Sequence, residues 1–511
     1  MNNLTIHLYS HSFVVSGFSR DMQRIIIEYA KQFVLYEKVR KWTGEIDTIA
    51  KCVFSTATSN KSEFRFHRNA YNDFLRFVGV YGYSSDMFTI IEAPPMIPQK
   101  VEIGILPTAT PRENQLPIID FITKDYPTKL VILQMGGGKT FSSLYSIALL
   151  KERFVISIRP MYIERWVKAL TDDKEKILDL QKEDIRVVRG GAELIKLIKD
   201  AKENNLKAKI IIISNKTLYL FYNHYKQTSG DTSLYGIHPI DFYPLLKANR
   251  LIDEVHQDFH LNFIQDLYTH TKTVVDLSAT MATESPFIKK MYGWRFPLQY
   301  RYEDTNYDKY TAAKALLYRI KDPGKIRFLS KGRSSYSHNE FEKSIRKDRK
   351  LQEKYLELID EALDNLYFTE DLQKGQKAVV YAGLVEMCQS IVDHLREKHP
   401  NLVINKYTSG DSYQNLIESD ISVTTIGSAG TAVDIPDIKL NLSTTAIGKR
   451  ETNEQLMGRC RRSKRWPNMT PIFAYMVCED IDKHINYHRK KIKFLEPYVL
   501  GIQTLYMDRS L

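Results

Sequence analysis

The stretch LVILQMGGGKTFSSLYSIALL, residues 130–150, decides how the rest of the chain is interpreted. Its first residues, LVILQ, form an apolar run typical of a buried strand, and FSSLYSIALL has the apolar spacing of a helix. Between them stand Gly136, Gly137 and Gly138. Glycine lets backbone N–H groups turn toward an anion with no Cβ in the way. Strand, glycine turn and helix in this order are typical of a phosphate-binding loop.

The residues after the glycines supply the chemistry that such a loop needs. Lys139 is placed to reach the β and γ phosphates of a nucleotide, and the hydroxyl of Thr140 is a ligand for Mg²⁺. The N-terminus of the following helix adds a favourable field for an anion. The strict pattern has glycine where Leu133 stands. The stretch nevertheless predicts a site for ATP and Mg²⁺.

A second stretch, LIDEVHQ at residues 251–257, places two acids at the end of an apolar run. At the carboxyl edge of a parallel sheet, adjacent carboxylates repel each other unless a cation lies between them. In a phosphate-loop ATPase, Asp253 would hold the water shell of Mg²⁺ and Glu254 would polarise the attacking water. The alternative is a pair of solvated surface acids, and the distant glycine loop favours the catalytic interpretation.

The apolar runs predict an α/β fold with two tandem parallel sheets. Five runs lie between residues 130 and 278, and five more lie between residues 377 and 477. Short alternating strands and two helical patterns precede them, followed by the proline-rich EAPPMIPQK. We therefore expect three domains: a small α/β N-terminal module at 1–92, a first lobe at 93–296, and a second lobe at 297–511.

Composition limits the class of protein. The chain has 511 residues and a net charge of +12, which suits a polyanionic partner such as nucleic acid but is also compatible with a merely basic protein. Its four cysteines form no C-x-x-C pair, so neither a zinc knuckle nor a disulfide framework is predicted. No apolar stretch is long enough to span a bilayer and no signal peptide is recognised, so we expect a cytoplasmic protein with no membrane partner.

Two basic regions are candidate nucleic-acid contacts. The segment 319–350 mixes basic residues with Phe and Tyr, and its alternative is a solvated surface excursion. The N-terminal module either grips DNA or braces the first lobe. The candidate contacts in the basic segment are Lys325, Arg327, Lys331 and Arg333, and the exposed candidates in the module are Arg40, Lys41, Trp42, Arg65, His67 and Arg68.

Taken in order, the motifs resemble those of superfamily 2 helicases and translocases. PRENQLPIIDFI resembles the adenine-recognition element, QMGGGKT motif I, and SIRPMYIERWVKAL motif Ia. IIIISNKTL resembles a later strand-end element of the first lobe, DEVH is similar to motif II and DLSAT to motif III. TTIGSAGTAVDIPDI resembles motif V and QLMGRCRR motif VI. The resemblance covers about residues 105–480 and implies two RecA-like lobes.

The resemblance also implies roles for individual residues. Gln115 would read the adenine, and Asp434 would join the nucleotide site. Gln455, Arg459 and Arg462 would act in catalysis from the second lobe, with the arginines supplying charge to the transition state. His256, Ser278 and Thr280 would couple hydrolysis to movement. The residues implied to lie near nucleic acid are Arg159, Ser214, Lys216 and Thr431.

In its architecture, its length and the form of its motifs, the chain most resembles phage recombination and branch-migration helicases of the UvsW type. This implies an ATP-dependent DNA helicase or translocase that unwinds or branch-migrates forked and junction DNA in replication, recombination or repair. We would expect a monomer in the host cytoplasm, with replication or recombination proteins as candidate partners. The alternatives are an RNA helicase, the ATPase motor of a DNA-packaging or restriction system, and a regulatory ATP-binding protein. DEVH in place of DEAD argues against the RNA-specific DEAD-box group.

Overall fold

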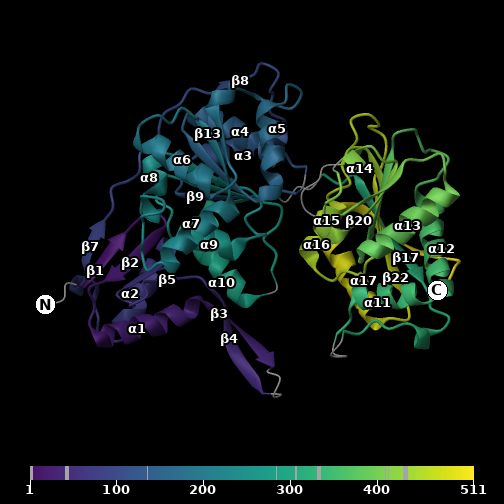
Figure 1. The fold of residues 1–511 in the computed structure, drawn as a ribbon, viewed down its shortest axis with the longest axis horizontal. Helices are drawn as coiled ribbons and strands as arrows, with labels where there is room; N and C mark the ends of the chain where they lie inside the picture. Colours follow the sequence, from purple (N-terminus) through teal and green to yellow (C-terminus); the bar gives the residue numbers. More distant parts are fainter. Residues whose placement is uncertain are drawn as a thin grey trace. The chain divides into compact units, whose positions relative to one another are not determined.

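The chain forms two compact units, Met1–Asp304 and Thr305–Leu511, in a computed structural model (Figure 1). The structure describes residues 4–40, 45–134, 136–283, 285–304, 308–330, 335–408, 410–412, 414–429 and 435–511. In these ranges no helix is long and apolar enough to cross a membrane. The two units are described separately below.

The first unit contains a seven-stranded parallel sheet in the order β12-β13-β10-β14-β15-β9-β16. The predicted strands of the first series all lie in it, and their central residues are buried. Its strands are β9 (Thr128–Ile132), β10 (Phe154–Ile158), β12 (Ile185–Val188), β13 (Ile210–Ser214), β14 (Asn249–Ile252), β15 (Val274–Ser278) and β16 (Arg301–Glu303). Its helices are α3 (Leu116–Thr123), α4 (Lys139–Leu150), α5 (Ile163–Thr171), α6 (Gly191–Lys202), α7 (Asn215–Gln227), α8 (Phe242–Leu246), α9 (Phe259–Asp266) and α10 (Pro286–Arg295). A short antiparallel pair joins β8 (Gly104–Ile105) to β11 (Leu178–Asp179).

The N-terminal residues form a separate five-stranded sheet in the order β5-β6-β2-β1-β7. The predicted short strands and helical patterns are present: the first two strands pair as an antiparallel hairpin, and the Ser19 hydroxyl caps the helix that follows. A two-stranded ribbon that the sequence patterns did not predict projects beyond this sheet (Figure 1). The elements are β1 (Thr5–Leu8), β2 (Ser12–Ser16), α1 (Arg20–Ala30), β3 (Val34–Arg40), β4 (Ile46–Val53), β5 (Thr56–Ala57), β6 (Glu63–His67), α2 (Tyr71–Gly79) and β7 (Thr89–Glu92).

The N-terminal sheet shares a hydrophobic core with the seven-stranded part of the first unit. Phe33 stacks on Trp294 with 4.4 Å between the ring centroids, and Phe54 meets Phe263 at 5.1 Å. The predicted boundary between residues 92 and 93 therefore separates two sheets that belong to one compact unit. The predicted boundary after residue 296 lies eight residues before the division at 304.

Buried charges also join the two parts of the first unit. The His67 Nε2 atom lies 3.2 Å from the Asp266 carboxylate, and Arg295 donates to the same carboxylate over 3.2 Å. Arg295 also donates to Asp276 over 3.0 Å. The expectation that His67 is exposed is wrong, since the residue is only 1% exposed and its ring completes this network. Arg40, Lys41 and Trp42 have side chains outside the described residues.

The second unit contains another seven-stranded parallel sheet, in the order β19-β20-β18-β21-β22-β17-β23. The second series of predicted strands is therefore confirmed, and the fold consists of two tandem RecA-like sheets. The strands are β17 (Thr311–Tyr318), β18 (Lys377–Ala382), β19 (Ile404–Tyr407), β20 (Ile421–Thr425), β21 (Ile438–Ser443), β22 (Ile472–Cys478) and β23 (Val499–Tyr506). The helices are α11 (His338–Lys347), α12 (Arg349–Leu366), α13 (Val385–Lys398), α14 (Gln414–Ile417), α15 (Ile426–Ala429), α16 (Arg450–Met457) and α17 (Asp482–Leu495).

Candidate nucleotide-hydrolysis site

Strand order brings three distant motifs to one edge of the first sheet. Strand β15 lies between β9, which leads into the glycine loop, and β14, which leads into the paired acids. Beyond the strand ends, the Leu133 N–H donates to the Ser278 carbonyl over 3.0 Å, and the Val255 N–H donates to the Leu277 carbonyl over 3.0 Å. Residues near 133, 254 and 278 consequently form a continuous surface at the carboxyl ends of the strands.

The glycine loop has the backbone that a phosphate cradle requires. Gly136 and Gly138 have φ values of 81° and 87°, in the left-handed region that favours glycine. A Cβ on Gly138 would lie 2.2 Å from the Gln115 side-chain nitrogen, so a larger residue would collide with this amide. The Gln115 oxygen accepts a hydrogen bond from the Arg112 N–H over 2.9 Å. The predicted adenine-reading amide therefore lies directly against the predicted phosphate loop.

Lys139 lies between the loop and the acids. Its ammonium group donates to the Leu133 carbonyl over 2.9 Å and lies 3.8 Å from the Glu254 carboxylate. Both side chains are 11% exposed, so water screens their attraction only weakly. Lys139 and Thr140 begin helix α4, whose N-terminus faces the same edge of the sheet. The structure thus places a cation, a helix N-terminus and a carboxylate around one small volume.

Asp253 is held by a partner that the sequence patterns did not single out. The Trp166 indole N–H donates to one carboxylate oxygen over 2.9 Å, and the Glu254 N–H donates to the other over 3.0 Å. Burial and the neighbouring Glu254 charge raise the pKa of Asp253 above its usual value. A buried carboxylate in that state favours a nearby cation, because a cation stabilises the ionised form. Trp166 is fully buried on α5.

Glu254 has a strained backbone and a carboxylate that is kept ionised. Its φ of 51° is in the left-handed region, which costs a non-glycine residue about 1–3 kcal/mol and is concentrated at functional sites. Burial is the largest single influence and raises the pKa of Glu254, but the Lys139 charge and the other groups around the carboxylate together hold this pKa below its usual value. The Ala279 N–H also donates to this carboxylate over 3.4 Å. An ionised carboxylate is the form that a general base needs.

His256 connects the acids to the end of β15. Its Nδ1 atom lies 2.7 Å from the Ser278 hydroxyl oxygen and 3.5 Å from the Glu254 carboxylate. Ser278 in turn donates to the Thr280 carbonyl over 2.5 Å. Burial lowers the pKa of His256, which favours the neutral ring. The three residues that the resemblance implies for coupling therefore form one hydrogen-bonded chain, and its first member lies beside the Glu254 carboxylate.

The residues at this edge fit Mg²⁺ bound together with a nucleotide. Among the described residues, no group of three or more His, Cys, Asp or Glu side chains could hold a metal ion on its own. Mg²⁺ usually keeps several waters and is bound by one or two carboxylates together with substrate phosphates. Asp253 and the Thr140 hydroxyl suit that sparse arrangement, because the phosphates and water would supply the other ligands.

The candidate nucleic-acid residues of the first unit are in three different environments. Arg159 is held by Asp258 through hydrogen bonds of 2.7 and 2.6 Å, and Asn215 donates to the same carboxylate over 2.9 Å. Ser214 is buried at the end of β13, whereas Lys216 is exposed on α7. Asp258, which the sequence patterns missed, therefore ties the strand-end element to the segment that follows motif II.

In the second unit, the motif VI residues lie on and after α16. Gln455 is half-buried on this helix, and Arg459 is buried just beyond it. Arg462 is exposed, donates to Asp308 over 2.8 Å and lies 5.4 Å from the centre of the Tyr310 ring. Two other residues assigned from the resemblance, Thr431 and Asp434, lie outside the described residues.

The basic segment 319–350 is only partly described. Lys325 and Arg327 are both exposed, and Lys325 forms a surface ion pair with Asp322 at 3.2 Å. Lys331 and Arg333 lie outside the described residues. Surface pairs of this kind contribute about 0–1 kcal/mol, so Lys325 is readily available to another anion.

No protein-family model and no curated protein sequence matches the chain. Solved structures do. The structure of Mss116p bound to ssRNA and AMP-PNP has a TM-score of 0.50 and 14% identity, covering 79% of this chain and 75% of that one. S. cerevisiae Dbp5 bound to RNA and ADP BeF3 has a TM-score of 0.50 and 12% identity, covering 79% of this chain and 95% of that one. The Pyrococcus furiosus Hef helicase domain has a TM-score of 0.45 and 13% identity, covering 75% and 98%. At such low identities the first two similarities concern the fold alone, and this chain shares the fold of those two proteins.

Proposed function

We propose that the chain is an ATP-dependent nucleic-acid helicase or translocase. The observation that carries this proposal is the arrangement of Lys139, Asp253 and Glu254 beside the glycine loop, with Lys139 Nζ 3.8 Å from Glu254. A nucleotide-binding role alone would need the loop and the lysine. It would not need a buried, strained and ionised carboxylate next to them.

In this proposal each residue of the site has a separate task. Lys139 leaves the Glu254 carboxylate to bind the β and γ phosphates, and Gly138 allows the backbone to approach them closely. Asp253, oriented by Trp166, holds the water shell of Mg²⁺. When bound, Mg²⁺ neutralises negative charge on the phosphates. Glu254 accepts a hydrogen bond from the attacking water and draws its proton away.

The same geometry gives the site a route to the rest of the first unit. When Lys139 moves from Glu254 to a phosphate, Glu254 loses its nearest cation. His256 lies 3.5 Å from this carboxylate and is hydrogen-bonded to Ser278. Its interaction with Glu254 therefore changes when Lys139 leaves. Ser278 is the last residue of β15, and Arg295 is hydrogen-bonded to Asp276 of the same strand. We propose that this chain of contacts transmits nucleotide state to the nucleic-acid contacts.

For the substrate we propose DNA, preferably forked or branched, as the resemblance to recombination helicases implies. The positive net charge and the exposed Lys216, Lys325 and Arg327 support a nucleic-acid partner in general. RNA is the second candidate, because two solved structures with TM-scores of 0.50, those of Mss116p and Dbp5, are bound to RNA. A DNA-packaging or restriction motor is the third, and it would need a nuclease or a capsid partner.

ATPase measurements on the full chain test the proposal directly. Turnover is measured without nucleic acid and with RNA, linear duplex DNA or forked DNA. A turnover with forked DNA that exceeds the turnover under the other three conditions supports DNA as the substrate. Stimulation of turnover by RNA alone would instead identify RNA as the substrate. Glu254→Gln keeps the size of the side chain but removes its basicity, so it is expected to bind ATP and to abolish turnover. Hydrolysis by this variant at the parental rate would disprove the catalytic assignment.

A further inference from the structure

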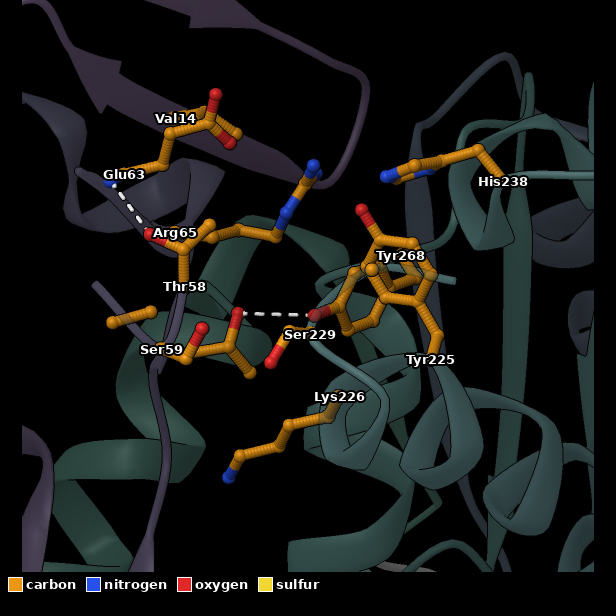
Figure 2. Close-up of a pocket in the computed structure, with 13 residues that line it drawn as sticks. Val14, Thr58, Ser59, Glu63, Arg65, Tyr225, Lys226, Ser229, His238 and Tyr268 are labelled. Carbon is orange, nitrogen blue, oxygen red and sulfur yellow. Dashed lines mark hydrogen bonds between the residues drawn. The ribbon is translucent and has the colours of Figure 1, made fainter. Parts of the chain in front are cut away.

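A pocket lies on the side of the first unit where the N-terminal sheet meets the α7 region (Figure 2), and no residue of the glycine loop lines it. One wall comes from β2, β6 and the turn before β6, and the other comes from the end of α7 and from the segments at residues 238 and 268. Its polar lining includes Arg65, Lys226, Ser59, Ser229, His238 and Glu63.

Arg65 is a cation without a carboxylate partner in the described part of the chain. One of its guanidinium nitrogens donates to the Ser12 hydroxyl over 2.9 Å and to the Leu267 carbonyl over 3.0 Å. The guanidinium also lies 5.1 Å from the centre of the Tyr9 ring and 5.0 Å from that of Tyr268. Burial lowers the pKa of Arg65, because removal from water disfavours the charged form of the guanidinium. Arg65 is half-buried and not exposed as predicted, and a cation in such a position is stabilised by an anion.

The other charges around the pocket leave it positive. Lys226 is exposed at the rim, across the pocket from Arg65 in Figure 2. Burial and the Arg65 charge lower the pKa of His238 to about 4, so this ring is neutral at pH 7. Glu63 lies two residues from Arg65 on the same strand and is the one acid among the lining residues. Its exposed carboxylate is screened by water, so it weakens the positive field without cancelling it.

The size of the pocket restricts what can enter it. Its volume is about 70 Å³, whereas sites for drug-sized ligands have about 300–1,000 Å³. A whole nucleotide would not fit. A phosphate group has few atoms, carries the complementary charge and accepts hydrogen bonds, which the hydroxyls of Ser59 and Ser229 and the cations at the site can donate.

We propose that this pocket binds a phosphate oxyanion, supplied either by the backbone of a nucleic acid or by free phosphate. The pocket is built from groups of both the N-terminal sheet and the α7 region, so neither part would form it alone. It is separate from the glycine loop, and the proposal does not depend on ATP hydrolysis.

Two exposed side chains of opposite charge test this without disturbing the core. Binding to the full chain is measured without nucleotide, by fluorescence anisotropy with a labelled DNA duplex and by calorimetry with inorganic phosphate. Lys226→Gln is expected to weaken binding about fivefold, and Glu63→Gln is expected to strengthen it by a similar factor. On B-form DNA, Lys226→Gln would also reduce the slope of log K against log salt by about 0.9. Lys196→Gln, on the exposed face of α6 outside the pocket, is the matched control and is expected to bind as the parent does.

The two ligands identify the source of the phosphate. Opposite shifts in the duplex assay assign the pocket to a nucleic-acid backbone, and opposite shifts with inorganic phosphate alone assign it to free phosphate. The proposal is overturned if Lys226→Gln and Glu63→Gln match the parent in both assays, or if both shift binding in the same direction. Because no ATP is present, this failure is distinguishable from a failure of the proposed ATPase.

Discussion

Replacing Asp266 by Asn tests whether the N-terminal sheet and the first RecA-like sheet are held together as one unit. The Asp266 side chain is 1% exposed and lies 3.2 Å from both His67 Nε2 and Arg295 Nε. Arg250 lies 3.7 Å from its other oxygen. Asparagine preserves the shape of the side chain but removes its charge. Two fully buried guanidinium groups would then have only Asp276 as a counter-charge.

The expected cost is large because every group is buried. Removing one partner from a buried ion pair typically costs about 3–5 kcal/mol. A unit of this size shifts its melting midpoint by about 2 °C per kcal/mol, so the midpoint of Met1–Asp304 is expected to fall by about 6–10 °C. Asp173→Asn is the control, since that side chain is 88% exposed and its surface pair contributes about 0–1 kcal/mol.

The loss of stability caused by Asp266→Asn is expected to depend on pH. Although burial opposes ionisation, Arg295 and His67 hold the pKa of Asp266 well below its usual value. A carboxylate whose folded pKa is depressed contributes stability that is fully present above its unfolded pKa, about 3.9, and is lost as the pH falls toward the folded pKa. The difference between the parent and Asp266→Asn is therefore expected to be constant from pH 5 to pH 7, on the order of the values above, and to shrink below about pH 4.

Thermal unfolding followed by tryptophan fluorescence measures this in the full chain. Three of the four tryptophans belong to the first unit, and Trp294 stacks on Phe33 of the N-terminal part at 4.4 Å. A midpoint within 2 °C of the parent, on the scale of about 2 °C per kcal/mol, would refute the argument that this network holds the two parts together.

Three further changes test the site and its nucleic-acid contacts. Trp166→Phe keeps an aromatic ring but removes the hydrogen bond to Asp253, so the Mg²⁺ concentration needed for half-maximal ATPase is expected to rise about 10–100-fold; an unchanged requirement would mean that the indole does not position Asp253. Arg462→Ala is expected to lower kcat with little change in ATP affinity, because the proposed interaction forms only in the transition state, and an unaltered kcat would remove this assignment. Replacing Lys325 and Arg327 together by Ala is expected to reduce the slope of log K against log salt for duplex DNA by about 0.9 for each phosphate that is no longer neutralised, and a parental slope would return both residues to the solvated surface.

Much of the fold could be predicted from the sequence, because each strand corresponds to a short continuous run of apolar residues. An apolar run such as residues 210–213 has to be buried on both faces, which requires a parallel sheet covered by helices whatever its neighbours are. The glycine loop was also predictable from the sequence, since the left-handed conformation at Gly136 and Gly138 excludes most other residue types. The candidate hydrolysis site was therefore predictable wherever a few adjacent residues carry the proposed chemistry, as in Lys139 and the pair Asp253 and Glu254.

Contacts between distant segments were decided only by the tertiary structure. Sequence periodicity shows that a face is buried but does not show what covers it, and His67 illustrates this: its position suggested an exposed base, whereas the fold places it against Asp266. No sequence pattern assigned a role to Trp166, whereas the fold of α5 places its indole N–H on Asp253. The order of the strands, with β15 between β9 and β14, is likewise invisible in the order of the chain. These features depend on the pairing of residues dozens to hundreds of positions apart, and no local pattern specifies which of the many compatible pairings has the lowest free energy.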